Sequence, residues 1–236
     1  MRLLLTLLTL LQLGLPFPGP GSPHSSATVT LVQQKSDGVV SGTLNITPPS
    51  NVTSGDFLIV ICGYWSGNGV STFNVTDTLA NTWTNRGVTG LNTSNFSSEA
   101  VIFTAVASST GTDTNVTCTQ AFDGHIDATF MEYSGATALD SGATDCNNNN
   151  SATTGVTHSV TSTATDTLVT FTFVAATSSS TLTTPTNYTL RVTGTGTSGD
   201  TFKAFDRSAV AAGAQSVSNV GSGTTPLHSC LIGIHP

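Results

Sequence analysis

Polar and apolar residues alternate along most of the chain beyond residue 28. In Thr28–Gln34 the apolar side chains Val29 and Leu31 alternate with threonine and glutamine, which is the period-2 pattern of a half-buried strand. Asp56–Trp65 and Glu99–Ala107 are almost continuously apolar and predict central strands covered on both faces. No segment keeps a helical period. We expect about thirteen strands, the others at 44–46, 73–75, 115–120, 125–134, 157–161, 167–175, 188–193, 202–205, 216–220 and 230–235.

Many short strands with polar turns predict an all-β fold. We expect a two-sheet β-sandwich, jelly-roll-like, that covers residues 28–236 as a single domain, because no linker divides the chain. A short echo links Gly55–Val60 and Thr165–Thr170, each with an aspartate before a buried strand. Closure of a turn by the aspartate is the simpler interpretation. The polar tract Asn147–Ser151 is expected to be an exposed loop.

The first 27 residues have the layout of a signal peptide. Arg2 supplies a positive start, Leu3–Leu15 is mostly apolar, and prolines from Pro16 onward end any helix. The apolar run is too short to span a bilayer, which takes roughly 20 residues. A buried N-terminal helix is the alternative, but nothing amphipathic follows. We expect cleavage after Ala27, a secreted mature chain, and no membrane span within it.

The charge balance excludes two classes of partner. Charged residues make up 8% of the chain, the formal net charge is −7, and lysine and arginine together number six. Such a chain cannot neutralise a phosphate backbone or form a polybasic membrane patch, so we expect no nucleic-acid partner. The abundance of threonine and valine favours a pleated, half-buried surface.

Four cysteines follow the predicted signal peptide: Cys62, Cys118, Cys146 and Cys230. None has the C-x-x-C spacing of zinc or redox sites, and in an oxidising compartment they predict structural disulfides. Four cysteines allow three pairings, between which the sequence does not choose. Our preferred pairing joins Cys118 to Cys146 and Cys62 to Cys230. The second bridge would tie an early strand to the last one.

The sharpest group of chemically active residues is Asp123, His125, Asp127 and Glu132. On a strand that starts at His125, Asp127 shares the face of His125, whereas Glu132 points with the apolar set. A buried Glu132 needs a partner, so a structural contact with an arginine or backbone N–H groups is the simpler interpretation. The alternative is a glycan hydrolase, for which Asp127 or Glu99 would supply the second carboxylate, although no spacing selects them.

Metal and cofactor sites have weak signals. The histidines are scattered, and no G-x-S-x-G, P-loop or H-E-x-x-H motif occurs. Asp77 and Asn81 flank a turn and could supply oxygen ligands for calcium, but capping of a tight turn is the commoner outcome. We therefore predict no cofactor, no metal and no catalytic residues.

Aromatic side chains offer a second kind of site. Trp65, Trp83 and Tyr188 fall near strand ends, where flat rings could stack on a sugar; burial in the core is the competing interpretation. Eight Asn-x-Ser/Thr sequons, which would be exposed if glycosylated, occur at Asn45, Asn51, Asn74, Asn92, Asn95, Asn115, Asn149 and Asn187.

Four motifs resemble those of a group of secreted bacterial β-sandwich domains. They are a Gly-Asp-x-Leu-Ile-Val strand at Gly55–Val60, a Val-Thr-Asp-x-x-x-Asn-Thr-Trp turn at Val75–Trp83, a Glu-Tyr-Ser-Gly strand end at Glu132–Gly135, and a Tyr-Thr-Leu-Arg strand at Tyr188–Arg191. The resemblance implies a surface, adhesive or carbohydrate-binding type of domain. Its motifs are structural rather than catalytic.

Three functions follow as expectations. The first is a secreted, non-catalytic surface or extracellular-matrix protein that acts by binding or assembly. In one version Thr28–Gln34 leaves its own sandwich and completes a neighbour's sheet, which would make the protein a fibre subunit. The second is a carbohydrate-binding module that uses Trp65, Trp83 or Tyr188. The third is a glycan hydrolase that uses Glu132 and Asp127.

Overall fold

The computed structural model describes residues 28–66, 73–93, 96–113, 115–150, 154–175, 181–195, 200–222 and 226–236. The expected signal peptide, residues 1–27, lies outside this part. The described residues form fifteen strands and no helix: β1 (Thr30–Val40), β2 (Thr43–Ile46), β3 (Phe57–Ser66), β4 (Asn74–Asp77), β5 (Thr84–Thr93), β6 (Phe96–Val106), β7 (Val116–Thr119), β8 (His125–Ser134), β9 (Ala138–Asn149), β10 (Val156–Ser162), β11 (Asp166–Val174), β12 (Thr189–Thr195), β13 (Thr201–Val210), β14 (Gly213–Asn219) and β15 (Leu227–His235). The expected all-β sandwich is confirmed.

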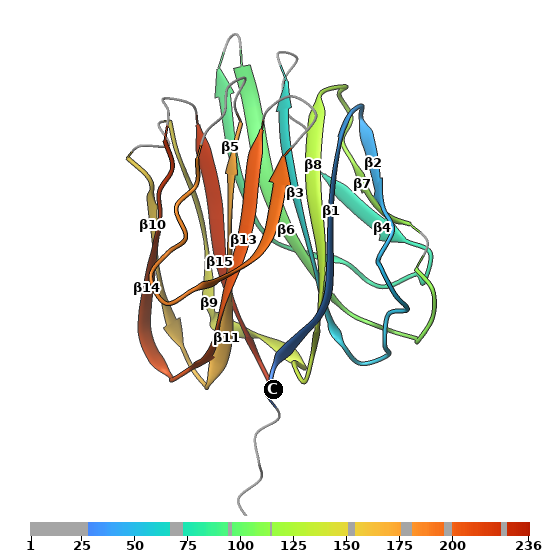
Figure 1. The fold of residues 1–236 in the computed structure, drawn as a ribbon, viewed down its shortest axis with the longest axis vertical. Coiled ribbons are helices and arrows are strands. Elements are labelled where there is room, and N and C mark those ends of the chain that lie inside the picture. Colours follow the sequence, from blue (N-terminus) through green and yellow to red (C-terminus); the bar gives the residue numbers. More distant parts are fainter. Residues whose placement is uncertain are drawn as a thin grey trace, which may run out of the picture.

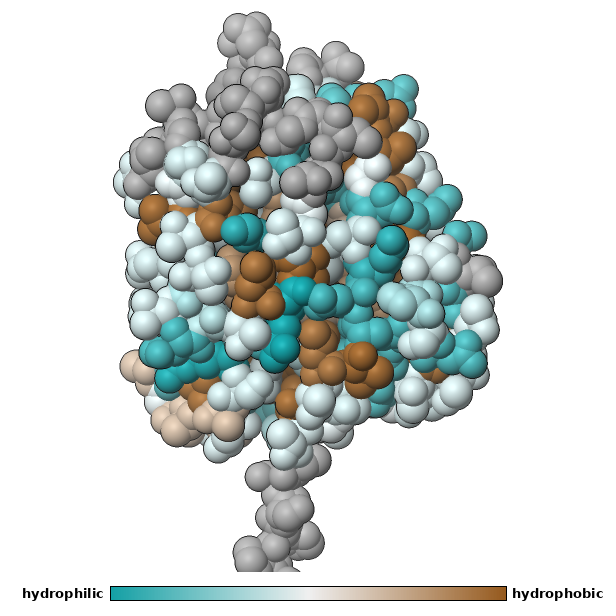
Figure 2. All heavy atoms as spheres, viewed as in Figure 1, coloured by the Kyte–Doolittle hydropathy of each residue, from teal (hydrophilic) through white to brown (hydrophobic). Residues whose placement is uncertain are grey.

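The strands form four antiparallel sheets rather than the two expected. Two five-stranded sheets, ordered β1-β8-β3-β6-β5 and β12-β13-β11-β15-β9, lie at the centre. A three-stranded sheet, β2-β7-β4, covers the first, and a two-stranded sheet, β10-β14, covers the second. Figure 1 shows the two small sheets on opposite flanks of the molecule. Apolar residues on the face drawn in Figure 2 lie in small groups separated by more polar ones.

The two halves of the chain repeat one topology. Strands β1–β8 form repeat 1 and strands β9–β15 form repeat 2. The central sheet of repeat 1 contains the first, last, third, sixth and fifth strands of that repeat, in this order. In the described part of the chain, repeat 2 has one strand fewer, but an isolated bridge at Leu182 occupies the place of its fourth strand. Counted in this way, the order β9-β15-β11-β13-β12 again contains the first, last, third, sixth and fifth strands. Gly55–Val60 and Thr165–Thr170 lead into the equivalent strands β3 and β11. Their likeness therefore marks equivalent positions, and the simpler turn-closure interpretation was incomplete.

A matching irregularity supports the repeat. In repeat 1 a bulge leaves Arg86 unpaired between β5 and β6, and in repeat 2 a bulge leaves Arg191 unpaired between β12 and β13. The Arg86 Nε donates to Thr104 Oγ1 at 2.7 Å, and the Arg191 Nε donates to Asp206 Oδ1 at 2.8 Å. A bulge re-aims the side chain of its extra residue, so both repeats use an arginine to fasten the edge strand to the next strand.

A shared core joins the repeats. Ile59 and Ile61 of β3 pack in one apolar cluster with Val169 and Phe171 of β11. In this core, strands β3 and β11 approach each other so closely that a Cβ on Gly63 would lie 2.7 Å from the Phe173 ring. Separate clusters fill the space between each central sheet and its small outer sheet. Side chains on one face of β3 therefore pack in the shared core and those on the other face pack in the outer core of repeat 1, as the continuous apolar sequence of this strand predicts.

The preferred disulfide pairing, Cys118 with Cys146 and Cys62 with Cys230, is wrong, although all four cysteines are bridged. The bonds join Cys62 to Cys118 and Cys146 to Cys230. Cys62 and Cys118 meet inside the core of repeat 1, and Cys146 lies directly opposite Cys230 in the β9–β15 ladder. The preferred pairing fails because each of its bridges would join repeat 1 to repeat 2, whereas Cys118 lies against β3 of its own repeat and Cys146 lies against β15 of its own repeat.

The polar tract at Asn147–Ser151 also differs from expectation. Its first three residues end β9, which pairs with β15 through Asn149 opposite Leu227. A strand at the edge of a sheet can be held by backbone hydrogen bonds without apolar side chains, so the polar composition of this segment predicted a loop where a strand forms. None of the described residues belongs to a helix that could cross a membrane.

Candidate functional site

An acidic cleft opens between the two repeats. Its volume is about 300 Å³, and β1 and β8 of repeat 1 face β12 and β13 of repeat 2 across it. Gly38 lines one side and Gly194 the other, and the polar side chains of the lining carry hydroxyl and carboxyl groups. The lining residues are Ser36, Asp37, Gly38, Asp127, Ala128, Thr193, Gly194 and Phe202.

Asp127, one of the lining residues, belongs to a pair of buried carboxyl groups. Asp127 on β8 and Asp200, just before β13, are 4% and 1% exposed and are hydrogen-bonded to each other. Burial raises the pKa of Asp127 to about 8, and the nearby charges of Asp200 and Asp37 act in the same direction. The pair therefore holds a shared proton at neutral pH. The Oδ2 atom of Asp127 has no hydrogen-bond partner among the described residues.

Trp65 fastens this pair at the end of β3. Its Nε1 donates to Asp200 Oδ2 at 2.7 Å, and its ring stacks on His125 with centroids 4.4 Å apart. His125 and Asp127 lie on the same face of β8, as the alternation predicts. Asp123 lies apart from them, exposed, where its Oδ1 accepts a hydrogen bond from the Gly42 N–H at 3.1 Å.

The other two predicted aromatic residues, Trp83 and Tyr188, belong to other apolar clusters and occupy equivalent positions in the repeats. Each lies three residues before the bulge arginine. Trp83 packs on the outer core of repeat 1 and donates from Nε1 to Asp77 Oδ2 at 2.7 Å. Tyr188 is 8% exposed within the outer core of repeat 2. The structure thus places Trp65, Trp83 and Tyr188 in three separate clusters, with no shared platform.

Asp77 and Asn81, the candidate calcium ligands, form a closed turn. Asp77 Oδ1 accepts from the Asn81 N–H at 3.0 Å, and Asp77 Oδ2 accepts from the Asn81 side chain at 2.9 Å. Asn81 Oδ1 in turn accepts from the Ser108 N–H at 2.8 Å. The carboxylate caps a turn, as the commoner interpretation holds.

Glu132 is fully buried on the opposite face of β8 from Asp127. Its Oε1 accepts from the Thr53 N–H at 2.8 Å, and its Oε2 accepts from the Gln33 side chain. The hydrogen-bonded neighbour Asp56 has its pKa raised to about 6, mainly by burial and then by Glu132. Because Glu132 and Asp127 lie on opposite faces of β8, they share no cleft.

Glu99 is buried at the far end of the face that carries Glu132. The two residues pair with positions of β3 that are six residues apart, Tyr64 and Leu58, which corresponds to roughly 20 Å along a strand. Burial raises the pKa of Glu99 to about 7. Glu99 is therefore not a second carboxylate for Glu132.

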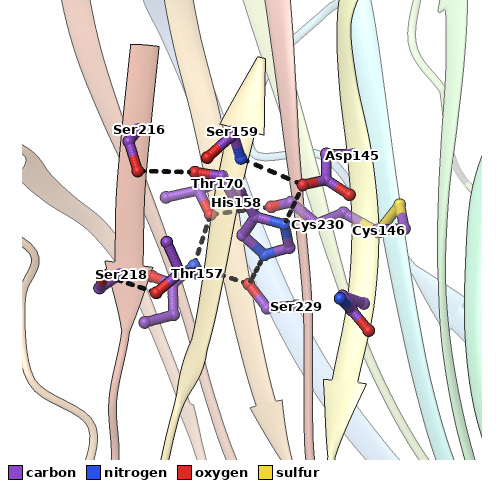
Figure 3. A network of polar contacts seen from close by, with 12 residues as sticks. Asp145, Cys146, Thr157, His158, Ser159, Thr170, Ser216, Ser218, Ser229 and Cys230 are labelled. Atoms are coloured by element: carbon purple, nitrogen blue, oxygen red, sulfur yellow. Dashed lines mark hydrogen bonds and ion pairs between the residues drawn. A yellow bond between two sulfur atoms is a disulfide. The ribbon is translucent and has the colours of Figure 1, made fainter.

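Repeat 2 contains a Ser-His-Asp arrangement that sequence reasoning missed. Figure 3 shows His158 between Asp145 and Ser229, with Nδ1 3.3 Å from Asp145 Oδ2 and Nε2 2.9 Å from Ser229 Oγ. Ser229 is completely buried and donates to the Phe171 carbonyl at 2.6 Å, while it accepts from the Asn219 side chain. Because its only proton goes to Phe171, His158 must donate to Ser229, the reverse of what a general base does. The arrangement is a core hydrogen-bond network.

Most sequons with described side chains are exposed. Asn149 is half-buried and donates from Nδ2 to the Gly155 carbonyl at 3.0 Å, so its amide is engaged. Asn95 and the side chain of Asn92 lie outside the described residues. The exposed asparagines are Asn45, Asn51, Asn74, Asn115 and Asn187.

Comparisons with family models, with curated proteins and with solved structures find no match to this chain.

Proposed function

We propose that the protein is a secreted, non-catalytic surface or extracellular-matrix protein that binds a carbohydrate in the acidic cleft. The observation that carries the proposal is a carboxyl pair beside an open cleft: Asp127 lines the cleft, is 4% exposed, and is hydrogen-bonded to the buried Asp200. Polar groups that converge on a cleft are a feature of ligand-binding sites. A sugar ring supplies O–H groups, which can donate to the carboxyl oxygens of Asp127.

The rest of the cleft suits the same ligand. Ser36 and Thr193 provide hydroxyls on the two walls, and Asp37 provides an exposed carboxyl group. A few polar groups that converge on one pocket are a feature of small-molecule sites. Trp65 contributes by holding Asp200 through its indole N–H rather than by stacking on the ligand.

The carboxyl pair supports binding over hydrolysis. Asp127 and Asp200 are in direct hydrogen-bond contact, whereas glycosidases hold their two carboxyl groups about 5 to 9.5 Å apart, with the scissile bond between them. Glu132, the other carboxylate considered for hydrolysis, lies on the far side of β8. A glycan would therefore be held without being cleaved.

A glycan microarray, followed by isothermal titration of the strongest hit, tests the proposal. Thr193→Trp fills the cleft from an exposed position and should weaken binding at least about tenfold. The matched control Thr43→Trp, on the exposed face of β2, should bind like the wild type. The proposal fails if the wild type retains no glycan, or if Thr193→Trp binds as well as Thr43→Trp.

Assembly by strand exchange ranks second. The segment Thr28–Gln34 begins β1, an edge strand with Val32 and Val40 exposed, and edge strands are open to further pairing. However, β1 already pairs with β8 from Thr30 to Val40, and exchange would first have to break that ladder. Fibres seen by electron microscopy would place assembly first.

A further inference from the structure

We propose that Asp140, Asp166 and His235 form a binding site for a divalent transition-metal ion, for which zinc is the best match. The three side chains come from the start of β9, the start of β11 and the end of β15. One ligand atom from each lies within 4.8 Å of the others. The site belongs to repeat 2 and is separate from the acidic cleft.

Two atoms inside this group lack hydrogen-bond partners among the described residues. Asp166 Oδ1 belongs to a side chain with 0% exposure, and it faces His235 Nδ1 at 3.8 Å. Neither atom has a hydrogen-bond partner among the described residues. A buried carboxylate oxygen and a buried ring nitrogen that face each other without a hydrogen bond leave a position that a cation bonded to both would satisfy.

The surroundings hold the ligands in place. Asp140 Oδ1 accepts from the Gly142 N–H at 2.9 Å, and Asp140 Oδ2 accepts from the Thr163 N–H at 2.6 Å and the Thr163 hydroxyl at 2.9 Å. The Ser162 hydroxyl donates to Asp166 Oδ2 at 2.6 Å. Such secondary contacts fix the orientation of metal ligands.

The donor set selects the class of ion. Two carboxylates and one imidazole are typical of zinc and related transition metals, whereas calcium and magnesium prefer oxygen ligands alone. Zinc bonds of about 2.0–2.2 Å hold neighbouring ligand atoms roughly 3.3–3.5 Å apart. The 3.8 Å between Asp166 Oδ1 and His235 Nδ1 needs only a slight contraction.

Repeat 1 provides an internal comparison. Asp56 precedes β3 as Asp166 begins β11, and Asp56 also contacts a second carboxyl group, Glu132. No imidazole completes that group, since no described trio there has the ligand spacing found in repeat 2. The metal site is thus an addition to repeat 2, where the ion would tie the last strand to β9 and β11.

The test uses untagged protein stripped with EDTA and titrated with zinc in a calorimeter, with cobalt absorption as a second readout. The wild type should bind one zinc ion and gain thermal stability. His235→Gln changes a side chain that is 28% exposed, so it should fold, and it should bind zinc at least about 100-fold more weakly. Asp166→Asn should behave similarly.

Asp56→Asn is the matched control, and its zinc affinity should equal that of the wild type. The proposal is overturned if the wild type binds no zinc. It is also overturned if His235→Gln keeps the wild-type affinity and cobalt spectrum, because the bound ion would then lie elsewhere. If Asp166→Asn does not fold, the comparison of His235→Gln with the wild type still decides the matter.

Discussion

Replacing Asp127 with asparagine should remove a large part of the pH dependence of stability. The pKa of Asp127 is about 8 in the folded protein, against an ordinary value of 3.8. Between these two values the folded state keeps a proton that the unfolded chain releases. Folding therefore loses stability as pH rises through this window, by about 1.4 kcal/mol per pH unit.

The magnitude follows from the window chosen. From pH 5 to pH 7 the wild type should lose about 3 kcal/mol through Asp127 alone. Burial raises the pKa of Asp56 and of Glu99 as well, to about 6 and about 7, so the wild-type curve contains their contributions too. Their contributions cancel when Asp127→Asn is compared with the wild type, because they are common to both proteins. An amide at position 127 can still donate to Asp200, which preserves the local geometry.

Urea unfolding with the disulfides intact, followed at pH 5, 6 and 7, measures this difference. The free energy of unfolding of Asp127→Asn, relative to the wild type, should grow by about 3 kcal/mol between pH 5 and pH 7. Asp123→Asn, an exposed change outside the lining of the cleft, should run parallel to the wild type. Parallel curves for Asp127→Asn would refute the shared proton.

Two further predictions concern the repeat interface and the buried serine. Gly63→Ala would bring a Cβ to 2.7 Å from the Phe173 ring and should lower the free energy of unfolding by about 1–3 kcal/mol, a loss that adding Phe173→Leu should partly recover. Gly90→Ala is the control, because a Cβ there would have an ordinary spacing of 3.7 Å. Equal stability of the two alanine variants in urea unfolding would contradict the close approach at Gly63. A fluorophosphonate probe should label neither the wild type nor Ser229→Ala, because Ser229 is fully buried; labelling that disappears in Ser229→Ala would show that the network is catalytic.

Strands with an alternating or continuous apolar sequence could be predicted because burial alone specifies them. The expected strand at 125–134 coincides with β8, and the one at 56–65 is shifted by one residue from β3. β5 and β9 were missed because they are edge strands, rich in glycine, asparagine and threonine. Their side chains contribute little to a core, and their backbones are held by the neighbouring strand instead.

The acidic cleft could be predicted only in part. His125 and Asp127 were expected on one face of a strand, because alternation is a local property. Their partner Asp200 comes from the other repeat, and no local pattern links position 127 to position 200. The aromatic expectation was limited in the same way: Trp83 and Tyr188 were considered as separate candidates, although they hold equivalent positions in the two repeats.

This equivalence separates scaffold from function. Residues that recur at matching positions, such as Trp83 with Tyr188 and Arg86 with Arg191, form the contacts that close each repeat. A contact needed by any copy of the fold gives no reason to assign a ligand. By contrast, the Asp127–Asp200 pair joins non-equivalent positions across the interface, and His235 has no counterpart within a ligand trio in the described part of repeat 1. Binding chemistry is therefore best sought where the symmetry between the repeats is broken.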